Sequence, residues 1–169
     1  MKALRVLHKS AELSTCGQYR WWLRRQWAGG NGQIVCFIML NPSTADADLD
    51  DPTIRRCIGF AQDWGFSMLS VRNLFAYRAT DPKTLLSVQD PVGGSRGNAE
   101  LLAGCTAHIT VVAWGSYVPW DRDRSALAMI EAHFPGKQLL CLGITKHGKP
   151  RHPLYVPASQ PLVPYEVSR

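Results

Sequence analysis

The sequence predicts a single α/β domain, a three-layer sandwich with a mostly parallel central sheet and an N-terminal antiparallel hairpin. Apolar stretches of strand length recur along the chain, amphipathic helical patterns stand between them, and the two alternate after an initial pair of strands. Alternation of this kind is typical of a parallel sheet with helices on both faces. At 169 residues the chain is long enough to bury a sizeable core as one domain over 1–169.

The first two strands are predicted to pair as the hairpin. Residues 19–27 (YRWWLRRQW) alternate between two faces and are rich in aromatic side chains, a pattern typical of a strand. The glycine-rich segment 29–32 predicts a turn, and residues 33–40 follow as the second arm. The continuous apolarity of 33–40 indicates burial on both faces, as in a central strand. The two ends of the chain, 1–17 and 158–169, are expected to be peripheral.

The clearest helix signal follows this second strand. Asp51 is a good N-cap and Pro52 a good first helical residue. Apolar residues then recur at helical spacing, at Ile54, Cys57, Ile58, Ala61 and Trp64. Gly65 suits the position just after a helix, where the backbone often turns left-handed. A helix is therefore predicted from Pro52 to Trp64.

The remaining segments continue the alternation. In chain order they are a strand at 67–72, a short helix at 82–86, a loop at 90–97, a helix at 98–105, a strand at 108–114, a helix at 122–134 and a strand at 138–142. Five prolines after residue 144 exclude a regular helix or a central strand from that region. Residues 144–169 should therefore form an ordered loop followed by a tail.

Composition and charge narrow the class of protein. With 19 Lys and Arg against 13 Asp and Glu, the net charge is +6, which suits a polyanionic partner as well as a solvated basic surface. No apolar run is long enough to span a bilayer, and the N-terminus lacks a signal-peptide pattern, so a cytoplasmic protein is expected. None of the five cysteines forms a C-x-x-C pair, which argues against a zinc ribbon or an iron–sulfur site.

Polar residues stand where the predicted parallel strands end. Asn41, Asn73 and Trp114 end three strands in turn, and the fourth strand leads into a loop that contains His152. Because the carboxyl ends of parallel strands share one edge of a sheet, Asn41, Asn73 and His152 are expected to meet in one pocket. Each of the three also has a plain structural interpretation, as a turn residue, a loop cap or a loop hydrogen-bond partner.

An acidic run between residues 46 and 51 mimics the start of a calcium loop. However, Asp51 stands where such a loop needs glycine, and Cys57 where it needs a bidentate glutamate. Helix capping by Asp51 and solvation of the other carboxylates is the better interpretation, so no metal site is predicted.

Four segments carry a resemblance to known proteins. They are LNPSTADADLDDPT at 40–53, NLFAYRATDP at 73–82, AWG at 113–115 and GKPRHPLY at 148–155. Together they resemble a family of bacterial and phage proteins described only as a domain of unknown function. More distantly, their order is similar to that of the uracil-DNA glycosylase superfamily, which has a parallel sheet between helices. The chain departs from its motifs at Leu40 and Met39, where glycine is often found, and at Leu154, where serine commonly follows His-Pro.

The superfamily resemblance implies a monofunctional DNA glycosylase that hydrolyses the N-glycosidic bond of a flipped uracil or modified base, phage-type hypermodified pyrimidines included. By motif match, Asn41 would orient the attacking water and Asn73 would read the base edge. His152 would donate a hydrogen bond to O2 of the leaving base. Asp46 is predicted as an auxiliary base for the water, and the chemistry requires no metal and no cofactor.

Further contacts are predicted around these residues. Pro42 and Trp114 are expected to bind the base, and the expected phosphate contacts are Ser43, Ser116, Lys146, Lys149 and Arg151. DNA is the expected partner and a monomer the expected state, with a role in DNA repair or in phage defence. Two alternatives remain open: a non-catalytic nucleic-acid or nucleotide-binding module of the same fold, and an N-glycoside hydrolase of free nucleosides or nucleotides. The net charge disfavours the second alternative, because a small substrate needs no basic surface.

Overall fold

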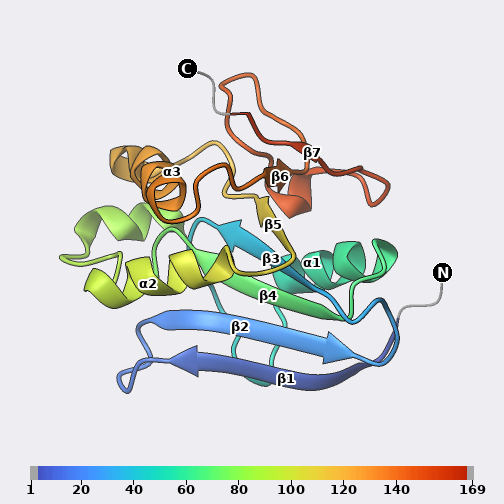
Figure 1. The fold of residues 1–169 in the computed structure, drawn as a ribbon. Helices are drawn as coiled ribbons and strands as arrows, with labels where there is room; N and C mark the ends of the chain where they lie inside the picture. The colour runs from blue at the N-terminus through green and yellow to red at the C-terminus, as the bar shows by residue number, and fades with distance from the viewer. Residues whose placement is uncertain (1–3, 167–169) are drawn as a thin grey trace.

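The structure is a computed structural model that describes residues 4–166. It has a seven-stranded sheet with helices on both faces (Figure 1). The strand order is β1-β2-β4-β3-β5-β6-β7. The strands are β1 (Val6–Leu13), β2 (Arg20–Trp27), β3 (Ile34–Met39), β4 (Met68–Asn73), β5 (Ile109–Val112), β6 (Leu139–Cys141) and β7 (Val163–Pro164). The helices are α1 (Pro52–Asp63), α2 (Gly94–Gly104) and α3 (Arg122–His133), with 3₁₀ segments η1 (Pro82–Ser87), η2 (Pro119–Asp121) and η3 (Pro153–Tyr155).

The four central strands are parallel to one another, and the outer strands are antiparallel. β3 pairs in parallel with β4 and with β5, and β5 pairs in parallel with β6. The pairs β1–β2, β2–β4 and β6–β7 are antiparallel. The predicted α/β class is confirmed, but the predicted mostly parallel sheet is corrected to a mixed one. The parallel centre is the part that brings several strand ends to one edge.

The predicted hairpin has the wrong partner. β2 pairs with β1 and β4, whereas the apolar strand β3 lies between β4 and β5. β3 needs that central place because its residues are buried on both faces. β1 escaped prediction because most of its side chains are exposed or half-buried, as suits an edge strand. The terminal segments predicted as peripheral each contribute an edge strand, β1 and β7.

Two layers of core lie on opposite faces of the sheet. Alternate residues of β3 point to opposite faces, as in any strand. Val35, Phe37 and Met39 pack in the cluster that contains α1, and Cys36 and Ile38 pack in the cluster that contains α2 and α3. β3 is therefore held from both sides, which fixes the position of the loop that follows it.

Helix α1 lies where it was predicted, whereas α2 begins four residues earlier than the helix predicted at 98–105. The Asp51 carboxylate accepts the N–H of Ile54 at 2.8 Å, which is the predicted N-cap bond. α2 begins at Gly94, inside the predicted loop at 90–97. A Cβ at Gly97 would stand 1.8 Å from the carbonyl oxygen of Val92, so packing demands this glycine within the helix. A glycine that the sequence marks as a turn signal can thus serve close packing instead.

Arg25 on β2 holds the loop that joins β3 to α1. Its side chain is fully buried, with 0% exposed. Its Nε binds Asp50 Oδ1 at 2.7 Å, and its Nη2 donates to the carbonyl oxygens of Asp46 and Leu49 at 2.6 and 3.1 Å. Asp50 also pairs with Lys9 of β1 at 2.8 Å. The two outer strands therefore determine where this loop lies.

Replacing Arg25 with Met should lower the free energy of unfolding by about 3 to 5 kcal/mol, because it leaves the Asp50 carboxylate without its buried partner. The double variant Arg25→Met with Asp50→Leu should be less destabilised than the sum of the two single changes, since neither charge is then left unpaired. Urea unfolding followed by circular dichroism measures these values. The exposed neighbour Arg24→Met is the control, and additive costs for the pair would contradict the ion-pair explanation.

Candidate functional site

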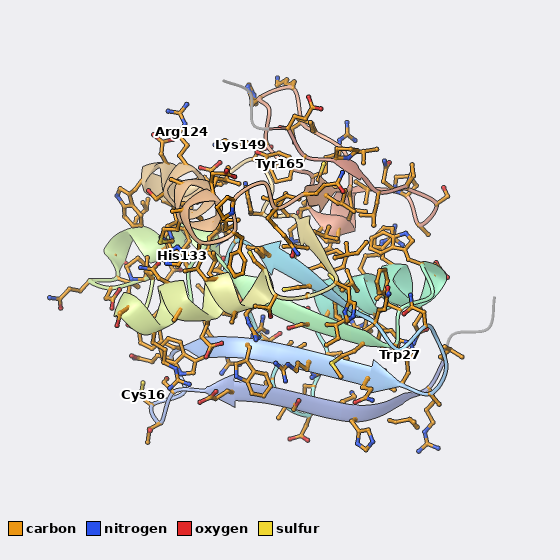
Figure 2. All side chains as sticks on the ribbon, viewed as in Figure 1. Cys16, Trp27, Arg124, His133, Lys149 and Tyr165 are labelled. Atoms are coloured by element: carbon orange, nitrogen blue, oxygen red, sulfur yellow. The ribbon has the colours of Figure 1, made fainter. Side chains whose placement is uncertain are left out.

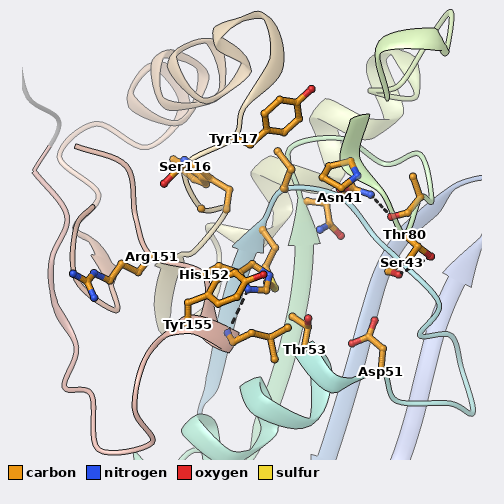
Figure 3. A pocket seen from close by; sticks show the side chains of 18 of the residues that line it. Asn41, Ser43, Asp51, Thr53, Thr80, Ser116, Tyr117, Arg151, His152 and Tyr155 are labelled. Atoms are coloured by element: carbon orange, nitrogen blue, oxygen red, sulfur yellow. Dashed lines mark hydrogen bonds between the residues drawn. The ribbon is translucent and has the colours of Figure 1, made fainter. Parts of the chain in front are cut away.

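A cavity of about 650 Å³ opens at the carboxyl ends of β3, β4 and β5 (Figure 3). β4 lies on one side of β3 and β5 lies on the other, so the direction in which the chain crosses the sheet reverses at β3. A crevice at such a switch point is where open α/β sheets bind their ligands. The topology therefore marks this cavity as the candidate site.

The structure brings seven of the predicted site residues to this cavity and leaves four outside its walls. The seven are Asn41, Ser43, Asn73, Trp114, Ser116, Arg151 and His152. The other four, which do not line the cavity, are Pro42, Asp46, Lys146 and Lys149. Figure 3 shows side chains from the segments after β3, after β5 and before η3 around one pocket. Asn41, Asn73 and His152 therefore line one cavity, as the shared edge of parallel strands predicted.

Asn41 is anchored by its amide nitrogen. Nδ2 donates to the carbonyl oxygens of Pro42 at 3.0 Å and of Ala79 at 2.8 Å. These two bonds use both N–H groups of the amide. Oδ1 makes no hydrogen bond with any residue between 4 and 166, so the group that Asn41 offers to a water or a ligand is an acceptor of fixed orientation.

Asn73 is anchored in the opposite sense. It is buried, and its Oδ1 accepts a hydrogen bond from Arg20 Nη2 at 3.3 Å. Its Nδ2 forms no bond with the described part of the chain, so Asn73 offers donors, together with the second lone pair of Oδ1. The Asn73 amide can therefore hydrogen-bond to a base edge on which an acceptor stands beside a donor.

His152 is a neutral hydrogen-bond donor. Its Nδ1 accepts the N–H of Leu154 at 3.3 Å, so the proton of the neutral ring sits on Nε2. Burial lowers the pKa of His152 to about 4, against the opposing effect of the Asp51 charge. At neutral pH the ring can therefore donate through Nε2 without carrying a positive charge.

Asp51 rather than Asp46 supplies the carboxylate of the cavity. Asp46 Oδ1 accepts the N–H groups of Asp48 and Leu49 at 2.9 and 2.8 Å, and these bonds hold the pKa of Asp46 below its ordinary value. Asp51 caps α1 with Oδ1 and lines the cavity, while its Oδ2 is unbonded within residues 4–166. The missed signal was the N-cap position itself, because the first helix after a central strand begins at this edge of the sheet.

The basic residues predicted for phosphate contacts divide between the rim and other places. Arg151 is exposed, and its Nε donates to the Ile144 carbonyl oxygen at 3.3 Å, at the rim of the cavity. Lys149 is bound instead to the Asp123 carboxylate of α3, near Tyr165 (Figure 2). Lys146 is exposed and does not line the cavity. One of the three predicted lysine and arginine contacts therefore lies at the cavity.

Arg20 is a wall residue that sequence reasoning missed. Its guanidinium comes from the first residue of β2 and is 2% exposed. Nη1 donates to the Ala45 carbonyl oxygen at 3.1 Å and Nη2 to Asn73. The alternating pattern of 19–27 located a strand but gave no sign that its first arginine would point to the site.

Residues 4–166 were considered as a whole for metal ligands and for membrane-spanning helices. Across this range no group of three or more His, Cys, Asp or Glu side chains could hold a metal ion. No helix of the described chain has both the length and the apolarity to cross a bilayer.

Comparison with protein families gives one match. Residues 20–154 match the family described as "Protein of unknown function (DUF1643)". The chain belongs to this family. Comparisons with curated proteins and with solved structures give no match. Nothing in these comparisons connects the chain with the uracil-DNA glycosylase superfamily, so that resemblance is a hypothesis to be judged on the geometry of the site.

The low pKa of His152 predicts a loss of stability in mild acid. The unfolded chain protonates this ring below its ordinary pKa of 6.5, whereas the folded protein does so only below about 4. Between these values the unfolded state binds more protons. The free energy of unfolding therefore decreases as the pH is lowered, by up to about 3 kcal/mol. Urea unfolding from pH 7 to pH 4 should show this slope, and His152→Gln should reduce it, most clearly between pH 7 and pH 5. The exposed His147→Gln serves as the control, and an unchanged slope in His152→Gln would refute the assignment.

Proposed function

We propose that the protein is a monofunctional DNA glycosylase that hydrolyses the N-glycosidic bond of a uracil or modified base flipped into the cavity. One observation carries this proposal. Three strand-end segments place an oriented acceptor (Asn41), buried amide donors (Asn73) and a neutral imidazole donor (His152) in the walls of one cavity. Base hydrolysis needs these three functions, and Asp51 adds a carboxylate to the same wall.

The proposed reaction has one bond broken and one bond formed at C1′ of the sugar. As the bond from C1′ to the base nitrogen breaks, its electron pair goes to the base and an oxocarbenium-like sugar develops. His152 Nε2–H donates to O2 of the leaving base and stabilises the charge gathering there. Asn41 Oδ1 and Asp51 hold a water, whose oxygen joins C1′ while its proton passes to Asp51 and then to the base.

The fold supports this proposal at a second level. The superfamily resemblance implies a parallel sheet between helices, and the four central strands with α1 on one face and α2 and α3 on the other have that arrangement. A uracil-DNA glycosylase-like fold is therefore part of the proposal. The antiparallel strands at the edges are additions to that parallel centre.

The mouth of the cavity has the side chains that a nucleic acid would contact. Tyr117, Leu154 and Tyr155 line the cavity and are exposed, Tyr155 to 80%. Ile144 is exposed beside Arg151. Aromatic and apolar side chains can stack on bases beside a flipped nucleotide, and the net charge of +6 attracts a phosphate backbone. Because Lys149 is bound to Asp123, phosphate contacts are assigned to Arg151, Lys146, Ser43 and Ser116.

Base release is the direct test. Oligonucleotides with uracil, hypoxanthine, or 5-substituted or glucosylated pyrimidines are incubated with the protein, and abasic sites are then cleaved with alkali. Asp51→Asn should slow release by roughly 10²- to 10⁴-fold, as loss of a general base does. His152→Ala should slow it by roughly 10²- to 10³-fold, as loss of a fixed donor to the developing charge does. Asp46→Asn is the matched control, since its carboxylate serves its own loop.

The same assay separates the alternatives. Equal losses in Asp46→Asn and Asp51→Asn would contradict the assignment of the base. Binding of these oligonucleotides without scission on any of them would favour a non-catalytic module. Release of base from free nucleosides or nucleotides alone would favour the N-glycoside hydrolase of small substrates.

A further inference from the structure

Two arginines of β2 are buried to the same degree but differ in what surrounds them. Arg25 is 0% exposed and pairs with the Asp50 carboxylate at 2.7 Å. Arg20 is 2% exposed, and its two hydrogen bonds go to uncharged oxygens, those of Ala45 and Asn73. No carboxylate between residues 4 and 166 lies within ion-pair distance of Arg20. Its Nε is buried without any partner in that range.

A buried cation without a counter-ion is costly unless a ligand supplies one. Burial lowers the pKa of Arg20 to about 10, while the charge of Asp51 opposes the change, so the guanidinium stays protonated at neutral pH. A guanidinium has five N–H donors, and the two bonds to Ala45 and Asn73 leave three of them, one of which is on the buried Nε. The cavity wall therefore holds a charged group with unused donors.

We propose that Arg20 forms an anion subsite in the cavity, so that the ligand carries a negatively charged oxygen group against this wall. The inference rests on the proposed function for its class of ligand, a nucleotide or a nucleobase. Two sources fit the same chemistry: an acidic substituent on the base, and the phosphate of the nucleotide itself. Asn73 belongs to the same subsite, because Arg20 holds its Oδ1 and leaves its Nδ2 donors for the ligand.

The size of the cavity agrees with a ligand larger than an unmodified pyrimidine ring. A volume of about 650 Å³ lies within the range of pockets that enclose drug-sized ligands. Arg151, by contrast, is exposed at the rim and suits a phosphate outside the cavity. Arg20 therefore suits a negatively charged group inside the cavity, whereas Arg151 suits a backbone phosphate outside it.

Calorimetric binding of three free probes tests the subsite. The probes are deoxyuridine, deoxyuridine 5′-monophosphate and 5-carboxydeoxyuridine. The wild type should bind one of the two anionic probes at least about 10-fold more tightly than deoxyuridine, in line with a charge-assisted hydrogen bond. Arg20→Met should remove that preference, so that the anionic probes bind no more tightly than deoxyuridine. The anionic probe that is preferred identifies the source of the charge.

Two further variants keep the test decisive. Arg124→Gln removes an exposed positive charge from α3, away from the cavity, and should retain the preference (Figure 2). Arg20→Lys keeps the charge without the planar donor set and should retain part of the preference, which covers the case in which Arg20→Met fails to fold.

Failure of the subsite is distinguishable from failure of the proposed function. The probes are recovered after each titration and checked by chromatography, so binding is scored whether or not base is released. Equal binding of all three probes by the wild type, no binding of either anionic probe, or a preference that survives in folded Arg20→Met would each overturn the anion subsite. Absence of base release would not.

Discussion

Three arginines donate hydrogen bonds to backbone carbonyl groups of the loop between β3 and α1. Arg78 donates to Ser43 and Thr44, Arg20 donates to Ala45, and Arg25 donates to Asp46 and Leu49, so the carbonyl oxygens across this loop receive donors from outside it. Ala45 is buried, and leaving its carbonyl oxygen unsatisfied would cost about 1 to 3 kcal/mol. The arginines therefore stabilise one conformation of a segment that has no regular secondary structure of its own.

The site depends on this arrangement because its groups stand at the two ends of the same loop. Asn41 lies near the start of the loop and Asp51 is its last residue, so their separation is set by the conformation that the arginines hold. His152 enters from the segment before η3, where its Nδ1 is bound to the Leu154 N–H. The result is a cavity with a fixed acceptor, a carboxylate and a neutral donor. Burial keeps His152 uncharged although Asp51 is near, because desolvation outweighs the attraction between the two.

The sequence was most informative where the physics is local. The N-cap Asp51, the apolar stripe of α1 and the polar ends of the central strands depend on near neighbours in the chain, and the structure has all of them. Pairing is not local, so the hairpin predicted for 19–27 was given the wrong partner. Asp46 and Asp51 have the same side chain, and it is the position of Asp51 as the N-cap of α1 that brings it to the cavity. Lys149 shows the same limit, since its partner Asp123 is on a helix that the sequence cannot position.

The outer strand β2 supplies a buried arginine to the site, which the parallel centre of the sheet alone does not provide. Arg20 donates its backbone N–H to Ala76, beyond the last residue of β4, so β2 runs past the end of its neighbour and its first side chain lies over Asn73. A sheet of only the four parallel strands would have no residue at that place. The family match begins at this arginine and includes Arg25 and Arg78, whereas β1 lies outside it. If the resemblance to glycosylases accounts for the strand-end residues, the addition of β2 accounts for the buried positive charge beside them. The part of the fold that departs from a parallel sheet is therefore the part expected to determine which ligand the cavity accepts.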